Sequence, residues 1–311
     1  MRSTPRLRRA TTLATLLATT LATTTALTLG CGPTRAPPAP PQTADEAPPA
    51  EPAASPAPKD TGLTGALSEE EFKALHELRG DAAPAPRGEM IELAGARAYL
   101  SLPEGQVAPI PGVVVIHEWW GLNEHIQHWA DRLAADGYAA LAVDLYGGQV
   151  ATDPEGAMAL MKTVDEAKAA AVLKAAHELL ASDARIKAPR RGVVGWCFGG
   201  GWSLRHAMAT PDLDAAVIYY GRLVTDPSAL EGIHAQLLGV FGDQDGGIPP
   251  EAVQEFKDAL AKAGKSIELH TYDANHAFAN PSSGRYDQQA AADAWSHVRA
   301  FFGRALKTPA S

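Results

Sequence analysis

The sequence predicts an α/β protein with a mostly parallel central sheet and helices on both faces of that sheet. From residue 112 onward, short apolar runs alternate with segments of helical periodicity, as in strand–helix–strand units. The run "GVVVIHE" at 112–118 is continuously apolar over its first five residues, which is typical of a strand buried on both faces. A length of 311 residues with 46 % hydrophobic residues suits one large domain of this class plus accessory segments.

The expected elements begin near residue 67, where the composition changes. Ser68 with Glu71 three residues later is a capping-box pattern and predicts a helix over 68–80. The alternation in 88–103 predicts a hairpin of two edge strands. Buried strands are expected at 112–118, 138–147, 190–196, 214–221, 236–242 and 266–273, and helices at 123–137, 153–182, 199–210, 249–264 and 285–306.

Residues 1–31 have the features of an export signal. "MRSTPRLRR" supplies four arginines and no acid, and an uncharged, threonine-rich apolar stretch follows it up to Cys31. A cysteine at this place resembles a bacterial lipoprotein signal, in which lipid is attached to the thiol. Thr28 stands where an aliphatic residue is usual, so an ordinary cleaved signal and an uncleaved anchor stay open. We expect a lipid-anchored protein of the cell envelope, periplasmic or on the outer surface.

Residues 32–66 are rich in proline and alanine and carry almost no large apolar side chain. Such a segment cannot bury enough surface to fold, so we expect a disordered tether between the anchor and a folded domain over 67–311. The formal net charge is −9, and the expected domain has no basic cluster. Both features argue against a nucleic-acid-binding protein, and the only membrane contact expected is the lipid anchor.

The stretch "GWCFGGG" at 195–201 places Cys197 in a glycine-rich turn between an expected strand and an expected helix. This is the arrangement of a nucleophile elbow, which lifts a nucleophile to the carboxyl end of the sheet. The pattern G-x-C-x-G-G has sulfur where serine hydrolases have oxygen. A lone cysteine is more often a small buried hydrophobe, and that reading stays open at this stage.

A base and an acid follow the elbow in the order that this arrangement requires, nucleophile then acid then base. Asp243 and Asp245 end one expected strand, and His276 lies in a loop after the next. The carboxyl ends of parallel strands are where open α/β sheets build their sites. The joint placement favours a triad of Cys197, one of the two aspartates and His276.

Several stretches together resemble the dienelactone hydrolase family of α/β-hydrolases. They span roughly residues 88–305 and include "VVIHEWWGLN", "GYAALAVDLYGG", "VGWCFGGGWSL", "VIYYG", "GVFGDQDGGIP" and "YDANHAFAN". The cysteine elbow is the most specific of these motifs, because ordinary serine esterases lack it. The resemblance implies the α/β-hydrolase fold and an ester-cleaving activity.

Residue by residue, the resemblance implies Cys197 as nucleophile and His276 as general base. It implies Asp245 as the acid, with Asp243 as the weaker candidate. Glu118 matches a glutamate that lies near the thiol and takes part in its activation, although it could be only a strand-end carboxylate.

The resemblance also implies the groups that surround the substrate. The backbone N–H groups of Phe198 and Trp119 would form the oxyanion hole. Aromatic side chains that could line the pocket, or could equally belong to the core, are Trp119, Trp120, Tyr219 and Tyr220.

The chain departs from the family where the substrate carboxylate is held. Family members have an arginine four residues after the histidine, where this chain has Asn280, and another in the segment that matches 151–165, which here has none. Asparagine cannot make a bidentate anion clamp, so dienelactone itself is in doubt as a substrate. Arg222 could supply a different cation or be a solvated strand-end charge.

We therefore expect a hydrolase that cleaves a small lactone or carboxylic ester through a thioester, with no metal or other cofactor. The oligomeric state is open. A noncatalytic envelope lipoprotein with the same fold is the alternative. A thiol redox protein would need a second, resolving cysteine. If Cys31 is lipidated or removed, the mature chain offers no such partner for Cys197.

Overall fold

The computed structural model describes residues 69–70, 72 and 86–307. The expected export signal, Cys31 and the expected tether over 32–66 lie outside these residues. Within the described part, no helix combines the length and the apolar character that a membrane span requires.

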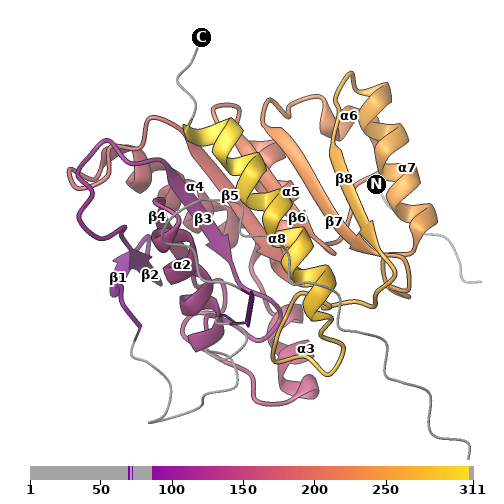
Figure 1. Ribbon diagram of the computed structural model, residues 1–311, viewed down its shortest axis with the longest axis horizontal. Coiled ribbons are helices and arrows are strands. Elements are labelled where there is room, and N and C mark those ends of the chain that lie inside the picture. Colours follow the sequence, from indigo (N-terminus) through magenta and orange to yellow (C-terminus); the bar gives the residue numbers. More distant parts are fainter. Residues whose placement is uncertain (1–68, 71, 73–85, 308–311) are drawn as a thin grey trace, which may run out of the picture. The chain divides into compact units, whose positions relative to one another are not determined.

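Eight strands form one sheet in the order β1-β2-β4-β3-β5-β6-β7-β8, shown in Figure 1. Strand β2 pairs antiparallel with both β1 and β4, and all other neighbours are parallel. The expected mostly parallel sheet is confirmed, but the 88–103 hairpin contributes one edge strand, β1, because β2 has a neighbour on each side. The strands are β1 (Glu89–Leu93), β2 (Ala96–Ser101), β3 (Gly112–Ile116), β4 (Ala139–Val143), β5 (Arg191–Trp196), β6 (Ala215–Tyr219), β7 (Gln236–Gly242) and β8 (Glu268–Tyr272).

Helices cover both faces of the sheet. One face packs against α2 (Glu124–Ala135) and α8 (Gln288–Phe302), and α8 crosses in front of the sheet in Figure 1. The other face packs against α4 (Glu166–Ser182), α5 (Phe198–Ala209) and α7 (Pro250–Lys262). The shorter helical elements are α3 (Pro154–Lys162), α6 (Pro227–Leu230) and a π-helical turn, η2 (Gly303–Lys307).

Alternate residues of β3 enter two different cores, which explains its unbroken apolar run. Val113 and Val115 belong to the cluster under α2 and α8, whereas Val114 and Ile116 belong to the cluster under α4, α5 and α7. All four side chains are completely buried. A strand with helices on both sides has no face left for polar residues.

The single helix expected over 153–182 is instead two helices, α3 and α4. The side chain of Asp165 accepts hydrogen bonds from the backbone N–H groups of Ala167 and Lys168, at 3.0 and 3.1 Å, and so caps a new helix. The expected start is confirmed, since Asp153 caps α3 and Pro154 occupies its first turn. An aspartate inside a helical pattern can therefore act as a new N-cap.

Of the helix expected over 68–80, the structure describes Glu69, Glu70 and Phe72, all of them helical. Glu69 forms a buried ion pair with Arg132 of α2 at 3.0 Å and accepts a hydrogen bond of 2.8 Å from the Tyr286 hydroxyl. These contacts tie the start of the described chain to α2 and to the loop that precedes α8.

Candidate active site

Cys197 lies in a sharp turn between β5 and α5, with φ 55° and ψ −114°. Positive φ is unusual for any residue other than glycine and costs about 1–3 kcal/mol where the surroundings impose it. Two glycines make the turn possible. A Cβ on Gly195 would collide with the backbone of Gly199, and a Cβ on Gly199 would collide with the carbonyl oxygens of Ile116 and His117. The elbow therefore packs directly against the carboxyl end of β3.

The turn leaves one backbone donor beside the thiol. Phe198 is the first residue of α5, and the first N–H groups of a helix have no acceptor within the helix. The rings of Phe198 and His117 stack at 5.6 Å, which holds the segment after β3, with Trp119, next to the elbow. The N–H of Phe198 is thus free of the helix and can serve another acceptor.

Asp245 and His276 are joined by a hydrogen bond of 2.6 Å between Oδ2 and Nδ1. The other oxygen of Asp245 accepts from the backbone N–H groups of Gly247 and Ile248, at 2.8 and 3.1 Å. Burial would raise the pKa of Asp245, but these hydrogen bonds and His276 lower it below its usual value. The alternative acid, Asp243, is exposed to solvent. The geometry therefore pairs His276 with Asp245.

The environment of His276 favours its protonated form. Burial lowers its pKa, but hydrogen bonding to Asp245 and to Cys197 outweighs burial and raises the pKa to about 10. The ring also packs against Tyr220, with centroids 5.1 Å apart. A cationic imidazole next to a thiol stabilises the thiolate form of that thiol.

Glu118 lies at the end of β3 and is 7 % exposed. Its Oε2 accepts a hydrogen bond from Asn280, whereas its Oε1 has no hydrogen-bond partner among the described residues. Burial raises the pKa of Glu118 to about 7, against the opposing effects of His276 and Asn280. This carboxyl group therefore changes its charge near neutral pH.

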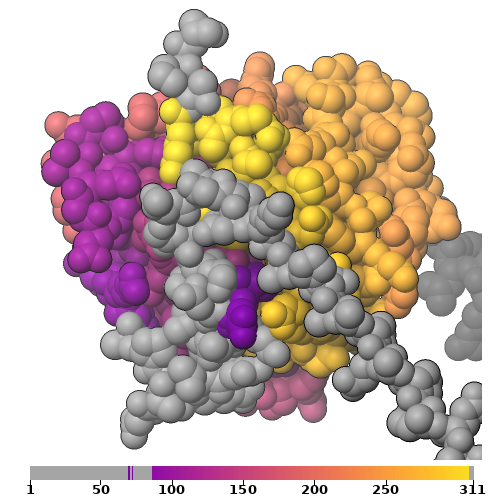
Figure 2. Space-filling model, viewed as in Figure 1, coloured from indigo at the N-terminus to yellow at the C-terminus, as the bar shows by residue number. Residues whose placement is uncertain are grey.

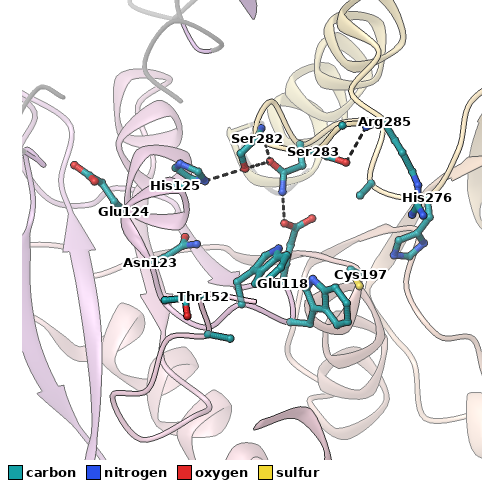
Figure 3. A pocket seen from close by; sticks show the side chains of 16 residues that line it. Glu118, Asn123, Glu124, His125, Thr152, Cys197, His276, Ser282, Ser283 and Arg285 are labelled. Carbon is teal, nitrogen blue, oxygen red and sulfur yellow. Dashed lines mark hydrogen bonds between the residues drawn. The ribbon is translucent and has the colours of Figure 1, made fainter. Parts of the chain in front are cut away.

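A chain of polar contacts holds Asn280 in place. Its Oδ1 accepts from the backbone N–H and the hydroxyl of Ser282, at 2.8 and 2.6 Å. The same hydroxyl lies 3.0 Å from Nδ1 of His125 at the start of α2. In Figure 3 the dashed contacts lead from His125 to Ser282 and on to Glu118. They connect α2 with the loop between β8 and α8.

These side chains surround a cavity of about 780 Å³, a size usual for a small-molecule site. Six of the predicted site residues line it, and Figure 3 shows Cys197, His276 and Glu118 together at its wall. Asp245 lies behind His276, outside the lining residues. The predicted site residues that line the cavity are Glu118, Trp119, Trp120, Cys197, His276 and Asn280.

The sequence model of the dienelactone hydrolase family matches residues 96–306. The chain belongs to the dienelactone hydrolase family. It is 32 % identical over 220 residues to a protein of Methylorubrum extorquens provisionally named carboxymethylenebutenolidase, a match that covers 66 % of this chain and 75 % of the relative.

Solved structures agree with this family membership. A provisionally named dienelactone hydrolase from Klebsiella pneumoniae has a TM-score of 0.63 at 30 % identity, over 67 % of this chain and 93 % of the other. A dienelactone hydrolase-like promiscuous phosphotriesterase from metagenomic libraries has a TM-score of 0.65 at 26 % identity, over 70 % and 98 %. The protein is thus a hydrolase with the α/β-hydrolase fold.

Three predicted pocket residues do not line the cavity of this dienelactone hydrolase. Tyr219 and Tyr220 are buried in the core, where Tyr219 stacks on Trp196 at 5.5 Å. They lie at the carboxyl end of β6, a strand covered on both faces, so their rings fill the interior. Arg222 is exposed and lies beside Gly201 of α5, outside the cavity lining.

Among the lining residues that the sequence does not predict are two basic ones, His125 and Arg285. Arg285 is exposed and belongs to the loop between β8 and α8 that also carries Asn280 and Ser282. Its position depends on how that loop folds back over the site, which no local pattern specifies. The only available signal is its place in the same loop as His276.

His117 has a structural role that sequence reasoning also missed. Its Nε2 accepts from the N–H of Leu145 at 3.1 Å, and its Nδ1 lies 2.5 Å from the carbonyl oxygen of Glu118. Burial lowers its pKa to about 4, so the ring is neutral at physiological pH. It ties the carboxyl ends of β3 and β4 together below Glu118 and Trp119.

Proposed function

We propose that this family member cleaves a small carboxylic ester or lactone by covalent catalysis, with Cys197 as nucleophile, His276 as general base and Asp245 as the orienting acid. The 2.6 Å contact between His276 and Asp245, next to a cysteine on a nucleophile elbow, carries the proposal. It matches the arrangement of nucleophile, base and orienting group that acyl transfer requires.

In the first half of the reaction, the Cys197 thiolate, paired with the protonated imidazole of His276, attacks the ester carbonyl carbon. The carbonyl oxygen becomes an oxyanion, to which the backbone N–H groups of Phe198 and Trp119 would donate hydrogen bonds. One such donor is worth about 3–4 kcal/mol in other acyl-transfer enzymes. Collapse of this intermediate breaks the bond to the alcohol oxygen, which takes the proton from His276. A thioester on Cys197 remains.

In the second half, water attacks the thioester carbonyl while His276 accepts a proton from it. The new tetrahedral intermediate collapses, the bond to sulfur breaks, and the product carboxylic acid leaves. For a lactone, the alcohol and the acid are ends of one hydroxy acid. Asp245 keeps the imidazole in one orientation through both halves and stabilises its cation.

Glu118 is assigned a part in activating the thiol. It lines the cavity near His276 and Cys197, and its Oε1 has no hydrogen-bond partner among the described residues. A carboxyl group with a pKa of about 7 can hold or release a proton under working conditions. Asn280, which donates to its Oε2, is the positioning residue for this carboxyl group.

Neutral substrates fit the wall of this cavity best. Its buried acidic group, Glu118, repels an anion, and Asn280 offers no charge to hold one. Arg285 could attract an acidic substrate, but its side chain is exposed. Solvent screening limits the stabilisation from an exposed ion pair to about 0–1 kcal/mol. An anionic lactone is the second candidate substrate. Two observations favour it: relatives are named carboxymethylenebutenolidase, and Arg285 lines the cavity.

The decisive test is hydrolysis of p-nitrophenyl esters and neutral lactones by the wild type and by Cys197→Ala. We expect turnover in the wild type and its loss in the variant. The thermal midpoint should hardly change, because one sulfur atom is removed and alanine can keep the turn. Activity that survives in Cys197→Ala would disprove the nucleophile. An inactive wild type would leave the noncatalytic alternative, which no structural observation favours.

A further inference from the structure

A polar seam joins the edge strand β8 to helix α8 and to the turn η2 that follows it. In Figure 2 the yellow surface of the α8 region lies directly beside the orange surface of the preceding segments. Three contacts follow one another along the seam. Glu268 pairs with Arg304 at 2.7 Å, the rings of His270 and His297 stack at 3.7 Å, and the Tyr272 hydroxyl donates to Asp293 at 2.8 Å.

The middle of this seam holds a cluster of metal-ligating atoms. Glu268, His270 and His297 each offer one such atom, and all three atoms lie within 4.8 Å of one another. Glu268 and His270 are two positions apart on β8, so both side chains face α8. All three residues are partly buried, and none of them lines the active-site cavity.

We propose that Glu268, His270 and His297 bind a divalent transition metal ion, with zinc as the reference ion. Two imidazoles and one carboxylate are a ligand set that zinc uses, and water completes a tetrahedral shell. Imidazole nitrogens also suit copper and nickel, whereas calcium and magnesium prefer oxygen ligands. Zinc–ligand distances of about 2.0–2.2 Å bring ligand atoms closer together than 4.8 Å. Binding therefore requires the stacked rings of His270 and His297, 3.7 Å apart and inclined by 21°, to rotate so that one nitrogen of each points at the ion.

Neighbouring charges already orient the three ligands. Arg304 holds Oε2 of Glu268 at 2.7 Å. Oε1 of Glu268 lies 2.9 Å from Nε2 of His270, a contact between two of the proposed ligands that a bound ion would replace. Asp293, one helical turn before His297, lies 3.4 Å from Nε2 of that histidine. Partners of this kind fix ring and carboxylate orientations around metals in other proteins.

The bound ion would link the edge strand to the helix that follows the active-site loop. Because β8 has a neighbour on one side only, cross-linking it to α8 strengthens the least supported strand at this end of the sheet. The ion has no part in the proposed ester cleavage. Its expected effect is on stability, since a ligand that binds only the folded chain raises the midpoint of unfolding.

The test measures zinc binding by titration calorimetry and by thermal shift on the full chain without an affinity tag. All proteins carry Cys197→Ala, because the active-site thiol and His276 could themselves bind zinc. We expect one zinc ion per chain and a rise of the thermal midpoint by about 5 °C at a large excess of zinc. Calcium and magnesium should give neither signal.

Variants locate the site. His270→Ala and His297→Ala should each weaken zinc binding about tenfold or more and remove the thermal shift. His234→Ala is the matched control, an exposed histidine outside the cluster, and should keep both signals. Midpoints without metal show whether each variant is folded. Unchanged zinc affinity in His270→Ala and His297→Ala, or no zinc binding by the parent protein, would overturn the proposal.

Discussion

At the scale of single residues, Glu118 is the group whose charge state activity can report. Burial raises its pKa from the usual 4.5 to about 7, although His276 and Asn280 act in the opposite direction. If the ionised carboxylate assists the thiol, wild-type kcat/KM for a neutral ester should rise as the pH passes through about 7. Glu118→Gln should be slower and should lack this rise. Initial rates of ester hydrolysis, measured over a range of pH in both proteins, test this prediction.

Two further variants sharpen the test. Asn280→Ala removes the hydrogen bond to Glu118 Oε2, which favours the ionised form, so the rise in kcat/KM should move to higher pH. Thr152→Ala is the control, because Thr152 lines the cavity and is exposed. Its profile should follow the wild type. A pH profile that is the same in Glu118→Gln and in the wild type would remove Glu118 from the mechanism.

At the scale of elements, the elbow depends on the contact between Gly199 and the end of β3. Gly199→Ala would press a methyl group against the carbonyl oxygens of Ile116 and His117. We expect it to lower the free energy of unfolding by about 1–3 kcal/mol, as overpacking does, and to reduce esterase activity strongly by displacing Cys197. Urea unfolding and steady-state rates measure the two effects.

Gly303→Ala serves as the control for this substitution. An added Cβ at Gly303, in the turn after α8, meets no atom within 4 Å. Its free energy of unfolding should stay within about 0.5 kcal/mol of the wild type. Equal stability and activity of Gly199→Ala and the wild type would show that the elbow tolerates a side chain at this position.

The elements that sequence patterns predict well are those whose burial is uniform. The run at 112–118 indicates a doubly covered strand because every apolar residue of β3 enters one core or the other. The break at Asp165 was missed because helical periodicity continues through it while a local cap interrupts the chain.

The site residues likewise differ in how well the sequence predicts them. Cys197, Asp245 and His276 follow strand ends, so a parallel sheet brings them to one edge and the sequence can predict their meeting. The positions of three other residues depend on how the last loop and α8 pack against β8. These residues are Arg285, His270 and His297. That packing is a tertiary contact without a local signal, so these residues could not be placed in advance.

At the scale of the whole molecule, the charge around the cavity sets the class of substrate. The wild type should have a higher kcat/KM for a neutral ester than for a carboxylate analogue of similar size. Arg285→Ala should lower the value for the anion by at most about fivefold, because an exposed ion pair is worth up to about 1 kcal/mol. Arg222→Ala, a cation outside the cavity lining, should change neither value. A wild-type preference for the anion that disappears in Arg285→Ala would identify Arg285 as an anion clamp.

The remaining prediction concerns where the whole chain resides, and it depends on Cys31. We propose that lipid attached to this thiol anchors the protein in the cell envelope, and the basic, then apolar, then cysteine order of residues 1–31 supports this. The proline- and alanine-rich segment 32–66 would then hold the hydrolase away from the lipid surface. Cells that express the full chain with labelled palmitate should yield a labelled protein in the membrane fraction. Cys31→Ala should lose the label, whereas Cys197→Ala, the matched cysteine control, should keep it. A soluble, unlabelled mature form of the wild type would show that Cys31 belongs to an ordinary export signal.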